Sequence, residues 1–318
     1  MKKVLVLGGS GSLGRGVISD LKEKHKVTAT YARNPFSEPG VEVQKLDIVN
    51  ISCIESMDAD FDAVVLIAGA MPATMKGYEP QRYIDTNITG TLNVLEFCRK
   101  NRIKKLTYVM TFSDVSHKFN SGEPIKSDDQ RGLTLVGDHA VYSVSKVAAI
   151  DLIEHYHQEY GLQTITLRIP TVYCADDNFN YYVDGVEKVK AYVQMIRSIV
   201  SESRVELWGD PNNAKDMPYI KDFARLVRLS IEHETAQGVF NAGTGSPVTL
   251  ADLVQVMGDV FSPDKKVTVI PRPEKPSQPN FTFDMSKTKE VFEFVPEWDV
   301  KSMLEDIRDT LGVEAFRA

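Results

Sequence analysis

Short runs rich in apolar and β-branched residues alternate with amphipathic stretches through the first half of the chain. The most continuous run, residues 63–70, has the unbroken hydrophobicity of a strand buried on both faces of a parallel sheet. The other strand candidates are residues 4–7, 27–31, 41–46, 103–110 and 162–169. Apolar residues recur at helical spacing over residues 12–24, 80–100 and 140–157. The alternation predicts an α/β fold with a doubly wound parallel sheet.

The pattern changes after Val172, where the second half of the chain begins. Residues 176–185 are rich in Asn, Asp and Tyr, and the amphipathic residues 186–200 are expected to form a helix. Further expected elements are a strand at 205–208, a loop at 209–218, a strand at 238–242 that returns to the sheet, and a proline-rich loop at 271–279. We therefore expect a nucleotide-binding domain over residues 1–173, with a return of residues 209–245, and a smaller interleaved domain over residues 174–208 and 246–318.

The first apolar run breaks into a glycine-rich turn, and a helical pattern begins near Ser12. Turn glycines let the backbone approach a pyrophosphate, and a helix N-terminus offers unpaired N–H groups and a partial positive charge. Gly9, Gly11 and Gly14 spell G-x-G-x-x-G, whereas Gly8, Gly11 and Gly14 spell G-x-x-G-x-x-G. Glycines also serve close packing, so the turn alone leaves both spellings open. Cofactor contacts are expected at Gly8, Gly11, Ser12, Leu13 and Gly14.

The end of the second strand candidate lacks the acidic residue that binds the ribose 2′-hydroxyl in NAD-binding units. Arg33 follows this strand, and no acidic residue occurs before Glu38. The guanidinium of Arg33 suits a 2′-phosphate, with a solvated loop arginine as the alternative. NADP is therefore favoured over NAD, although both stay open. The small residues at the end of the fourth strand candidate suit either a cofactor or close packing; they are Ala68, Gly69 and Ala70.

The net charge of -7 argues against nucleic acid or an anionic membrane as the main partner. Three widely spaced cysteines indicate no disulfide framework and fit a reducing compartment. No apolar run approaches the roughly 18 residues that span a bilayer, and no room for a signal peptide precedes the first strand. His155 and His157 lie two apart on a helix and make a poor metal pair. A cytoplasmic, soluble protein without a metal site is the expectation.

Ser113, Tyr142 and Lys146 form the set that carries chemistry. Ser113 lies at the end of the strand candidate 103–110 and before a polar, irregular stretch from Ser116 to Asp138. Tyr142 and Lys146 are four apart and share one helix face. A free phenol titrates near pH 10, and a neighbouring ammonium is expected to lower that pKa. With a hydride carrier opposite, these groups make an alcohol–ketone redox site.

With these motifs the chain resembles the extended short-chain dehydrogenases/reductases, the NAD(P)-dependent epimerases, dehydratases and reductases of nucleotide sugars, over nearly its whole length. That resemblance selects the Gly8, Gly11, Gly14 spelling and implies a Rossmann sheet. The matching segments are Asp47-Ile48 (the adenine-contacting pair), Asn87 with Gly90–Val94, Ser113 with Tyr142 and Lys146, Arg168–Tyr173, Trp208–Asp210, Lys215–Asp222, Val239–Gly243, Arg272–Glu274 and Asp284–Lys287.

The resemblance also assigns further residues to ligands. Cofactor contacts are expected at Asp47, Ile48, Asn87 and Val172, in addition to the residues already named. Substrate contacts are expected at Ser113, Asp114, Asn178, Lys215 and Arg272, with the arginine meeting a diphosphate; an exposed turn is the alternative for Asn178. A homodimer through the helices that carry Asn87 and Tyr142 is a further expectation.

Departures from the family pattern bear on the substrate. Val115 stands where dehydratases have the second member of an Asp-Glu pair, so dehydration is disfavoured. Ser116-His117 replace a usual Tyr-Gly, Cys174 replaces a Gly, and Lys215 replaces an arginine, giving a point charge in place of a fork. The redox site is unaffected by these changes, whereas the usual pose of a nucleotide sugar is put in doubt.

The function expected first is an NAD(P)-dependent epimerase or reductase acting on a nucleotide-linked sugar. An NADP-dependent carbonyl reductase with a non-sugar substrate is one alternative. A dinucleotide-sensing protein without catalysis is another, and the presence of all three candidate catalytic residues argues against it.

Overall fold

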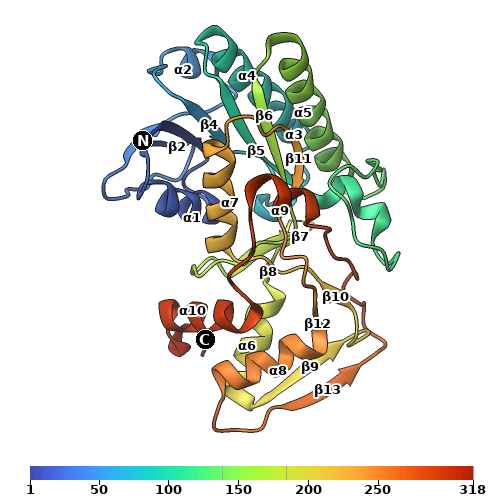
Figure 1. The fold of residues 1–318 in the computed structure, drawn as a ribbon. Coiled ribbons are helices and arrows are strands. Elements are labelled where there is room, and N and C mark those ends of the chain that lie inside the picture. The colour runs from blue at the N-terminus through green and yellow to red at the C-terminus, as the bar shows by residue number, and fades with distance from the viewer. Residues whose placement is uncertain (138, 184, 318) are drawn as a thin grey trace.

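The central sheet has seven strands, all parallel, in a computed structural model that describes residues 1–137, 139–183 and 185–317 (Figure 1). Their order is β11-β6-β5-β4-β1-β2-β3. The strands are β1 (Lys3–Leu7), β2 (Lys26–Tyr31), β3 (Glu42–Lys45), β4 (Ala63–Leu66), β5 (Lys105–Thr111), β6 (Gln163–Ile169) and β11 (Gly238–Asn241). The doubly wound parallel sheet predicted from the alternating pattern is confirmed, including the late return of residues 238–241 beside β6.

Helices cover both faces of this sheet because alternate residues of each strand point to opposite sides. Val4 and Val6 of β1 pack with α1 (Ser12–Leu21) and α7 (Ile220–Glu232), whereas Leu5 and Leu7 face α4 (Gly90–Lys100) and α5 (His139–Tyr160). Both faces are therefore buried, which explains the unbroken apolar runs.

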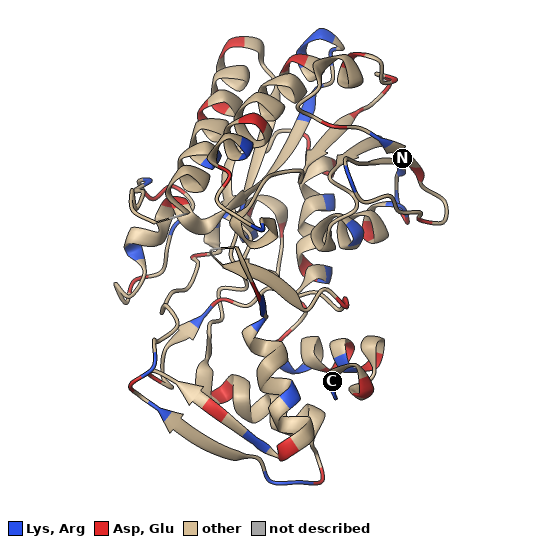
Figure 2. Ribbon diagram, turned by 180° about the vertical axis from the view of Figure 1, so that it is seen from behind, with Lys and Arg blue, Asp and Glu red and all other residues tan. Residues whose placement is uncertain are grey.

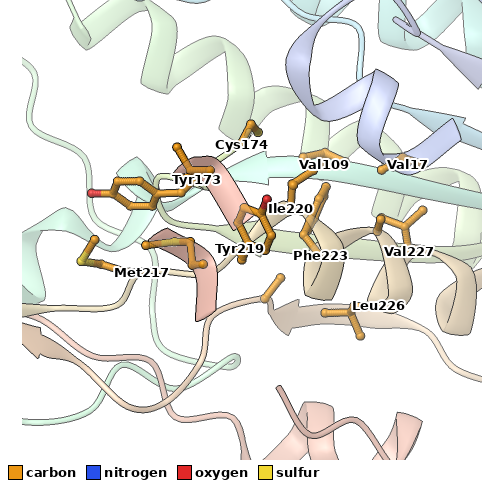
Figure 3. Packing of buried hydrophobic residues seen from close by; sticks show 14 of the residues in the cluster. Val17, Val109, Tyr173, Cys174, Met217, Tyr219, Ile220, Phe223, Leu226 and Val227 are labelled. Carbon is orange, nitrogen blue, oxygen red and sulfur yellow. The ribbon is translucent and has the colours of Figure 1, made fainter. Parts of the chain in front are cut away.

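The contact between α1 and α7 is close because α1 carries a glycine where the helices meet. A Cβ at Gly16 would collide with Ile220, the first residue of α7. Ile220, Phe223 and Val227 of α7 belong to one buried cluster with Val17 of α1 and Val109 of β5 (Figure 3). This packing fixes the second half of the chain against the sheet.

The helix predicted over residues 80–100 is present but changes its winding. α3 (Pro80–Tyr83) continues through a π-helical segment, η2 (Ile84–Thr89), into α4. A π-helical segment widens the turn locally and is frequent at functional sites. Here it contains Asn87, which is turned into the interior.

A smaller unit built from the later residues lies beyond the carboxyl ends of the strands (Figure 1). β9 (Arg204–Trp208) pairs in parallel with β13 (Thr268–Arg272), so the expected proline-rich loop at 271–279 begins inside a strand. β10 (Ala214–Lys215) pairs with β12 (Val248–Thr249), and the chain returns to the main sheet with α7. The remaining elements are α2 (Ile51–Glu55), α8 (Leu250–Phe261), α9 (Ser286–Phe292), α10 (Val300–Leu311), η1 (Pro72–Thr74), η3 (Phe112–Lys118) and η4 (Val313–Phe316).

The helix expected over residues 186–200 is wrong in its first part. Residues Asn180–Val183 (β7) and Val186–Val189 (β8) form an antiparallel hairpin, and the helix α6 starts only at Ala191 and ends at Glu202. Gly185 adopts a φ of +75°, a left-handed turn conformation that favours glycine. The spacing of Val186 and Val189 is compatible with a helix, yet β-branched residues after a turn glycine also suit a strand.

Residues 119–137, within the stretch expected to be irregular, contain no helix or strand, and Asp138 lies outside the described residues. Acidic and basic side chains are mixed over the helices and over β9 (Figure 2). None of the helices in the described ranges combines the length and apolar character that crossing a bilayer requires.

Candidate active site

A cavity of about 2170 Å³ lies at the carboxyl ends of the parallel strands and extends to the smaller unit. Open α/β sheets hold their ligands at this edge. The predicted site residues that line it are Gly8, Gly11, Ser12, Leu13, Gly14, Arg33, Asp47, Ile48, Ala68, Gly69, Ala70, Tyr142, Lys146, Val172, Asn178, Lys215 and Arg272. Three others do not line it: Asn87, Ser113 and Asp114.

The three glycines of the turn differ in what a side chain would meet. Gly8 has a φ of +95°, and a Cβ there would lie 2.5 Å from the amide nitrogen of Ala68. A Cβ at Gly14 would fall against the carbonyl oxygen of Gly8, so the helix can approach the turn only with glycine at this position. A Cβ at Gly11, by contrast, would meet nothing within 4 Å.

Gly11 is also the N-cap residue of α1, and no side chain caps the helix there. The first N–H groups of α1 are thus presented at the cavity beside open space, where an anionic group can approach the backbone. Gly9 differs, because a Cβ there would meet the side chains of Ile18 and Phe36, which indicates a packing role. The residues present therefore fit the pyrophosphate of a dinucleotide, and the Gly8, Gly11, Gly14 spelling agrees with this geometry.

Two guanidinium groups line the cavity near the carboxyl end of β2. Arg33 is exposed, whereas Arg82 of α3 keeps only 22 % of its side chain accessible, with the nearest carboxylate oxygen of Glu79 4.0 Å away. Burial lowers the pKa of Arg82, and the positive charge of Arg33 lowers it further. Two neighbouring cations at a cavity wall favour an anionic ligand group. The sequence singled out Arg33 only, since Arg82 lies about fifty residues later on another element.

Asn87 and Asn93 hold the cavity wall from behind. The Asn87 amide accepts from the N–H of Ala70 at 2.8 Å, donates to the carbonyl of Ala70 at 3.0 Å, and donates to the Ser145 hydroxyl at 2.9 Å. Asn93 donates to the carbonyl of Ile48 at 2.9 Å. Asn87 was expected to touch the cofactor; the structure places it one layer deeper, where it fixes the backbone that lines the cavity.

Lys146 is buried at the floor of the cavity. Its Nζ donates to the carbonyl of Val109 at 3.0 Å and lies 4.3 Å from the ring centroid of Tyr108. Burial lowers the pKa of Lys146 to about 7, because removal from water disfavours the charged form. The lysine therefore titrates in the physiological range.

Tyr142 borders the cavity beside Thr111. Burial raises the pKa of Tyr142, and a side-chain hydrogen bond with Thr111 opposes this. The expectation that Lys146 lowers the pKa of Tyr142 is not met in the protein alone, because desolvation dominates and the lysine is itself partly deprotonated near neutral pH.

The hydroxyl beside Tyr142 belongs to Thr111 and not to Ser113. Thr111 is the last residue of β5 and lines the cavity, whereas Ser113 lies in the following helical turn η3. The Ser113 Oγ is buried and has no hydrogen-bond partner among the described residues. Sequence reasoning took the serine and missed the threonine two positions earlier. The signal was present, since polar groups at the final residue of a parallel strand reach the ligand edge.

Asp114 is corrected from a substrate residue to a structural one. Its side chain is fully buried and accepts three hydrogen bonds from Arg168 at 2.8–3.1 Å. Arg168 also donates to the carbonyls of Lys126 and Ser127 and to the side chain of Asn241. The pair ties β6 to η3, to the irregular stretch and to β11, and a carboxylate that is 0% exposed and paired in this way is out of reach of a substrate.

The substrate side of the cavity is formed by the smaller unit. Arg272 donates to a carboxylate oxygen of Glu206 at 2.8 and 3.1 Å, so its charge is already paired. No ion pair involves Lys215 among the described residues, and its Nζ lies 5.9 Å from the ring centroid of Tyr173. Residues of this wall that the sequence reasoning did not assign to the site include Tyr181, Lys188 and Trp208. Tyr181 and Lys188 are cross-strand neighbours in the hairpin whose second strand, β8, was predicted to be helical.

A glycine turn at a helix N-terminus, with a Tyr-x-x-x-Lys pair at the same edge of a doubly wound sheet, defines the class of extended short-chain dehydrogenases/reductases. The chain belongs to the NAD dependent epimerase/dehydratase family, whose model matches residues 4–243. It is 24% identical to a UDP-glucuronate 4-epimerase of Thermodesulfobacterium geofontis, over 94% of this chain and 88% of that protein.

Solved structures of known enzymes share the fold. A UDP-glucose 4-epimerase from Thermotoga maritima, determined with UDP-glucose, superposes with a TM-score of 0.77 at 22% identity, covering 99% of this chain and 98% of the other. A UDP-glucose 4-epimerase from Thermus thermophilus, in complex with NAD, gives a TM-score of 0.76 at 22% identity, covering 99% of both chains. The Rossmann architecture predicted from the sequence is thus confirmed by structure and by family.

Proposed function

We propose that this protein is an NAD(P)-dependent epimerase acting on a nucleotide-linked sugar, with hydride transfer at a carbinol carbon. The observation that carries the proposal is the continuous cavity of about 2170 Å³ that joins the glycine turn, Tyr142 and the wall bearing Lys215. Sites for one small ligand typically occupy about 300–1000 Å³, so this cavity is large enough for a dinucleotide and a second nucleotide together.

The chain's own groups supply the proton chemistry. A bound nicotinamide dinucleotide would take the hydride from a carbinol carbon and return it. Tyr142 would accept the proton of the substrate hydroxyl as the hydride leaves and give it back when the hydride returns. Thr111 would hold the reacting oxygen by a hydrogen bond, and Lys146 would donate to a ribose hydroxyl and favour the phenolate. Ser113 and Asp114 have no part in this scheme.

Epimerisation is preferred over net reduction because the named relatives are UDP-sugar 4-epimerases. In an epimerase the hydride returns to the opposite face of the same carbon, so no cofactor is consumed. A reductase that uses the same residues would consume one reduced cofactor per turnover. The uridine diphosphate esters of hexoses and of glucuronate are therefore the first substrates to test.

The test is incubation of the protein with a panel of UDP-sugars in the presence of NAD or NADP, and in parallel of NADH or NADPH, followed by NMR of the sugar. The proposal predicts conversion to the 4-epimer without net change in reduced-cofactor absorbance in either set. Tyr142→Phe should abolish conversion while cofactor binding persists. Stoichiometric consumption of reduced cofactor would favour the reductase, and cofactor binding without turnover of any sugar would favour a non-catalytic dinucleotide-binding protein.

NADP is proposed as the preferred cofactor. Arg33 follows β2 in place of an acidic residue, and its neighbour Arg82 adds a second, half-buried cation to the same wall. A phosphate between them would relieve the repulsion of like charges and gain charge-assisted hydrogen bonds.

A homodimer through α4 and α5 is also proposed. The two helices lie side by side on one face of the sheet (Figure 1), and each leaves an apolar side chain exposed, Leu92 and Val144. Light scattering should give twice the mass of the chain, and a monomer at micromolar concentration would contradict the proposal.

A further inference from the structure

Tyr108 of β5 makes its polar contact through its ring and not through its hydroxyl. Its side chain is 1% exposed, and its hydroxyl has no hydrogen-bond partner among the described residues. A buried hydroxyl without a partner stabilises nothing. The contacts of the ring are therefore the ones that can give Tyr108 a role.

The ring of Tyr108 lies directly against the Lys146 ammonium, with Nζ 4.3 Å from the ring centroid. The face of an aromatic ring attracts a cation by its quadrupole, and the attraction is strongest where water is excluded. Lys146 is 6% exposed, and the Val109 carbonyl that accepts its hydrogen bond at 3.0 Å belongs to the same strand as the ring. Adjacent residues of β5 thus provide both contacts.

No described carboxylate forms an ion pair with this cation. The described groups at Nζ are the ring of Tyr108 and the carbonyl of Val109, both from β5, and a Cβ built on Gly69 at the end of β4 would lie 3.8 Å from Nζ. Of these only Tyr108 titrates, and burial raises its pKa, so it is neutral near pH 7; burial also raises the pKa of Tyr142, one helical turn before Lys146. A ring face and one carbonyl dipole are what stabilise the charge.

We propose that Tyr108 is a positioning residue of the active site, whose ring favours the ammonium form of Lys146 at the floor of the cavity, where no described carboxylate does so. A carboxylate would stabilise the charge equally well, but it would compete for the N–H donors and would oppose the phenolate of Tyr142. The neutral ring leaves the remaining N–H groups available for a ribose hydroxyl and for Tyr142.

The experiment measures the pKa of Lys146 directly in the ligand-free protein. Protein labelled with ¹³C at the lysine ε-carbons is titrated by NMR, and the Lys146 signal is assigned with Lys146→Arg. Tyr108→Phe keeps the ring and should leave the pKa within a few tenths of wild type. Tyr108→Leu removes the ring and should lower the pKa by about one unit, a roughly tenfold change in the ammonium-to-amine ratio. Tyr108→Met serves as a second ring-free variant if the leucine variant does not fold.

A second readout follows turnover, and this part rests on the function proposed above. The basic limb of the kcat/KM profile should move to lower pH in the ring-free variant by the same amount and be restored in Tyr108→Phe. An unchanged pKa in both ring-free variants, or an equal shift in the phenylalanine variant, would overturn the inference. Because the NMR titration needs no substrate, a protein that turns over no sugar would contradict the proposed function and leave this result standing.

Discussion

Removing one partner of the buried Asp114–Arg168 pair should destabilise the protein more than the loss of any exposed ion pair. The two side chains are 0% and 1% exposed, and three hydrogen bonds of 2.8–3.1 Å join them. Asp114→Asn leaves the guanidinium buried without its counter-charge and turns an amide N–H toward it. Uncompensated buried charges of this kind cost about 3–5 kcal/mol.

The double variant separates the charge effect from the loss of packing. Arg168→Met alone leaves a buried carboxylate and three unpaired acceptors, which are the carbonyls of Lys126 and Ser127 and the amide oxygen of Asn241. In Asp114→Asn with Arg168→Met both charges are gone, and only the hydrogen bonds are missing. We expect the double variant to be less destabilised than the sum of the singles by about 2–3 kcal/mol.

Urea unfolding at pH 7, followed by circular dichroism, provides the four free energies of the cycle. The matched control is Asp151→Asn, which breaks an exposed pair with Arg131 whose N–O distance is 2.6 Å and whose side chains are 35% and 61% exposed. That change should cost less than about 1 kcal/mol. The reasoning is refuted if Asp114→Asn costs no more than this control, or if the two single effects add. If Asp114 instead bound substrate, KM would rise in a variant that is fully folded.

Three further predictions concern the site and the stability of the fold. Thr111→Val should lower kcat about a hundredfold, as loss of a donor to a reacting oxygen does, while Ser113→Ala should change kcat by less than about twofold. The opposite result would show that Ser113, and not Thr111, holds the reacting oxygen. Arg33→Ala should weaken NADP binding by about ten- to a hundredfold and leave NAD binding nearly unchanged, as measured by calorimetry. An equal loss of affinity for both cofactors would exclude a contact between Arg33 and a 2′-phosphate. Burial lowers the pKa of Lys105 from 10.5 to about 8 in the folded protein. Between these pH values the unfolded chain binds more protons than the folded one, so the free energy of unfolding rises with pH, by about 2 kcal/mol between about pH 7.5 and 9.5. Lys105→Met should remove this rise, and identical pH slopes in the two proteins would contradict the shift.

The parts of the fold that the sequence predicted are those that leave a local pattern in the chain. Gly8 and Gly14 are glycines because a Cβ would collide with backbone, and such a requirement leaves a fixed spacing in the chain even where, as for Gly8 and Ala68, the partner is distant. The apolar runs follow from burial of the sheet on both faces. Tyr142 and Lys146 share a helix face by their spacing alone. Each of these patterns lies within a short stretch of sequence, so the element or pair can be predicted without knowing its partners.

Features decided by distant partners were the ones predicted incorrectly or missed. Ser113 and Thr111 are equally good hydroxyls in the sequence, and only the turn from β5 into η3 determines which one reaches the cavity. The pKa of Tyr142 depends on how deeply the cavity wall is buried, which no spacing encodes. Arg82 approaches Arg33 only because α3 and the end of β2 meet in the folded chain.

Asn87 and Asn93 explain why a motif can mark a ligand site without touching the ligand. Asn87 uses both ends of its amide on the backbone of Ala70, and Asn93 donates to the carbonyl of Ile48. A cavity wall made of main chain has little sequence preference of its own, so the side chains that hold it in place carry the recognisable pattern. Both asparagines are buried, where an unpaired backbone group would be costly. The same contacts that satisfy the backbone therefore also fix the shape of the surface that a dinucleotide would meet.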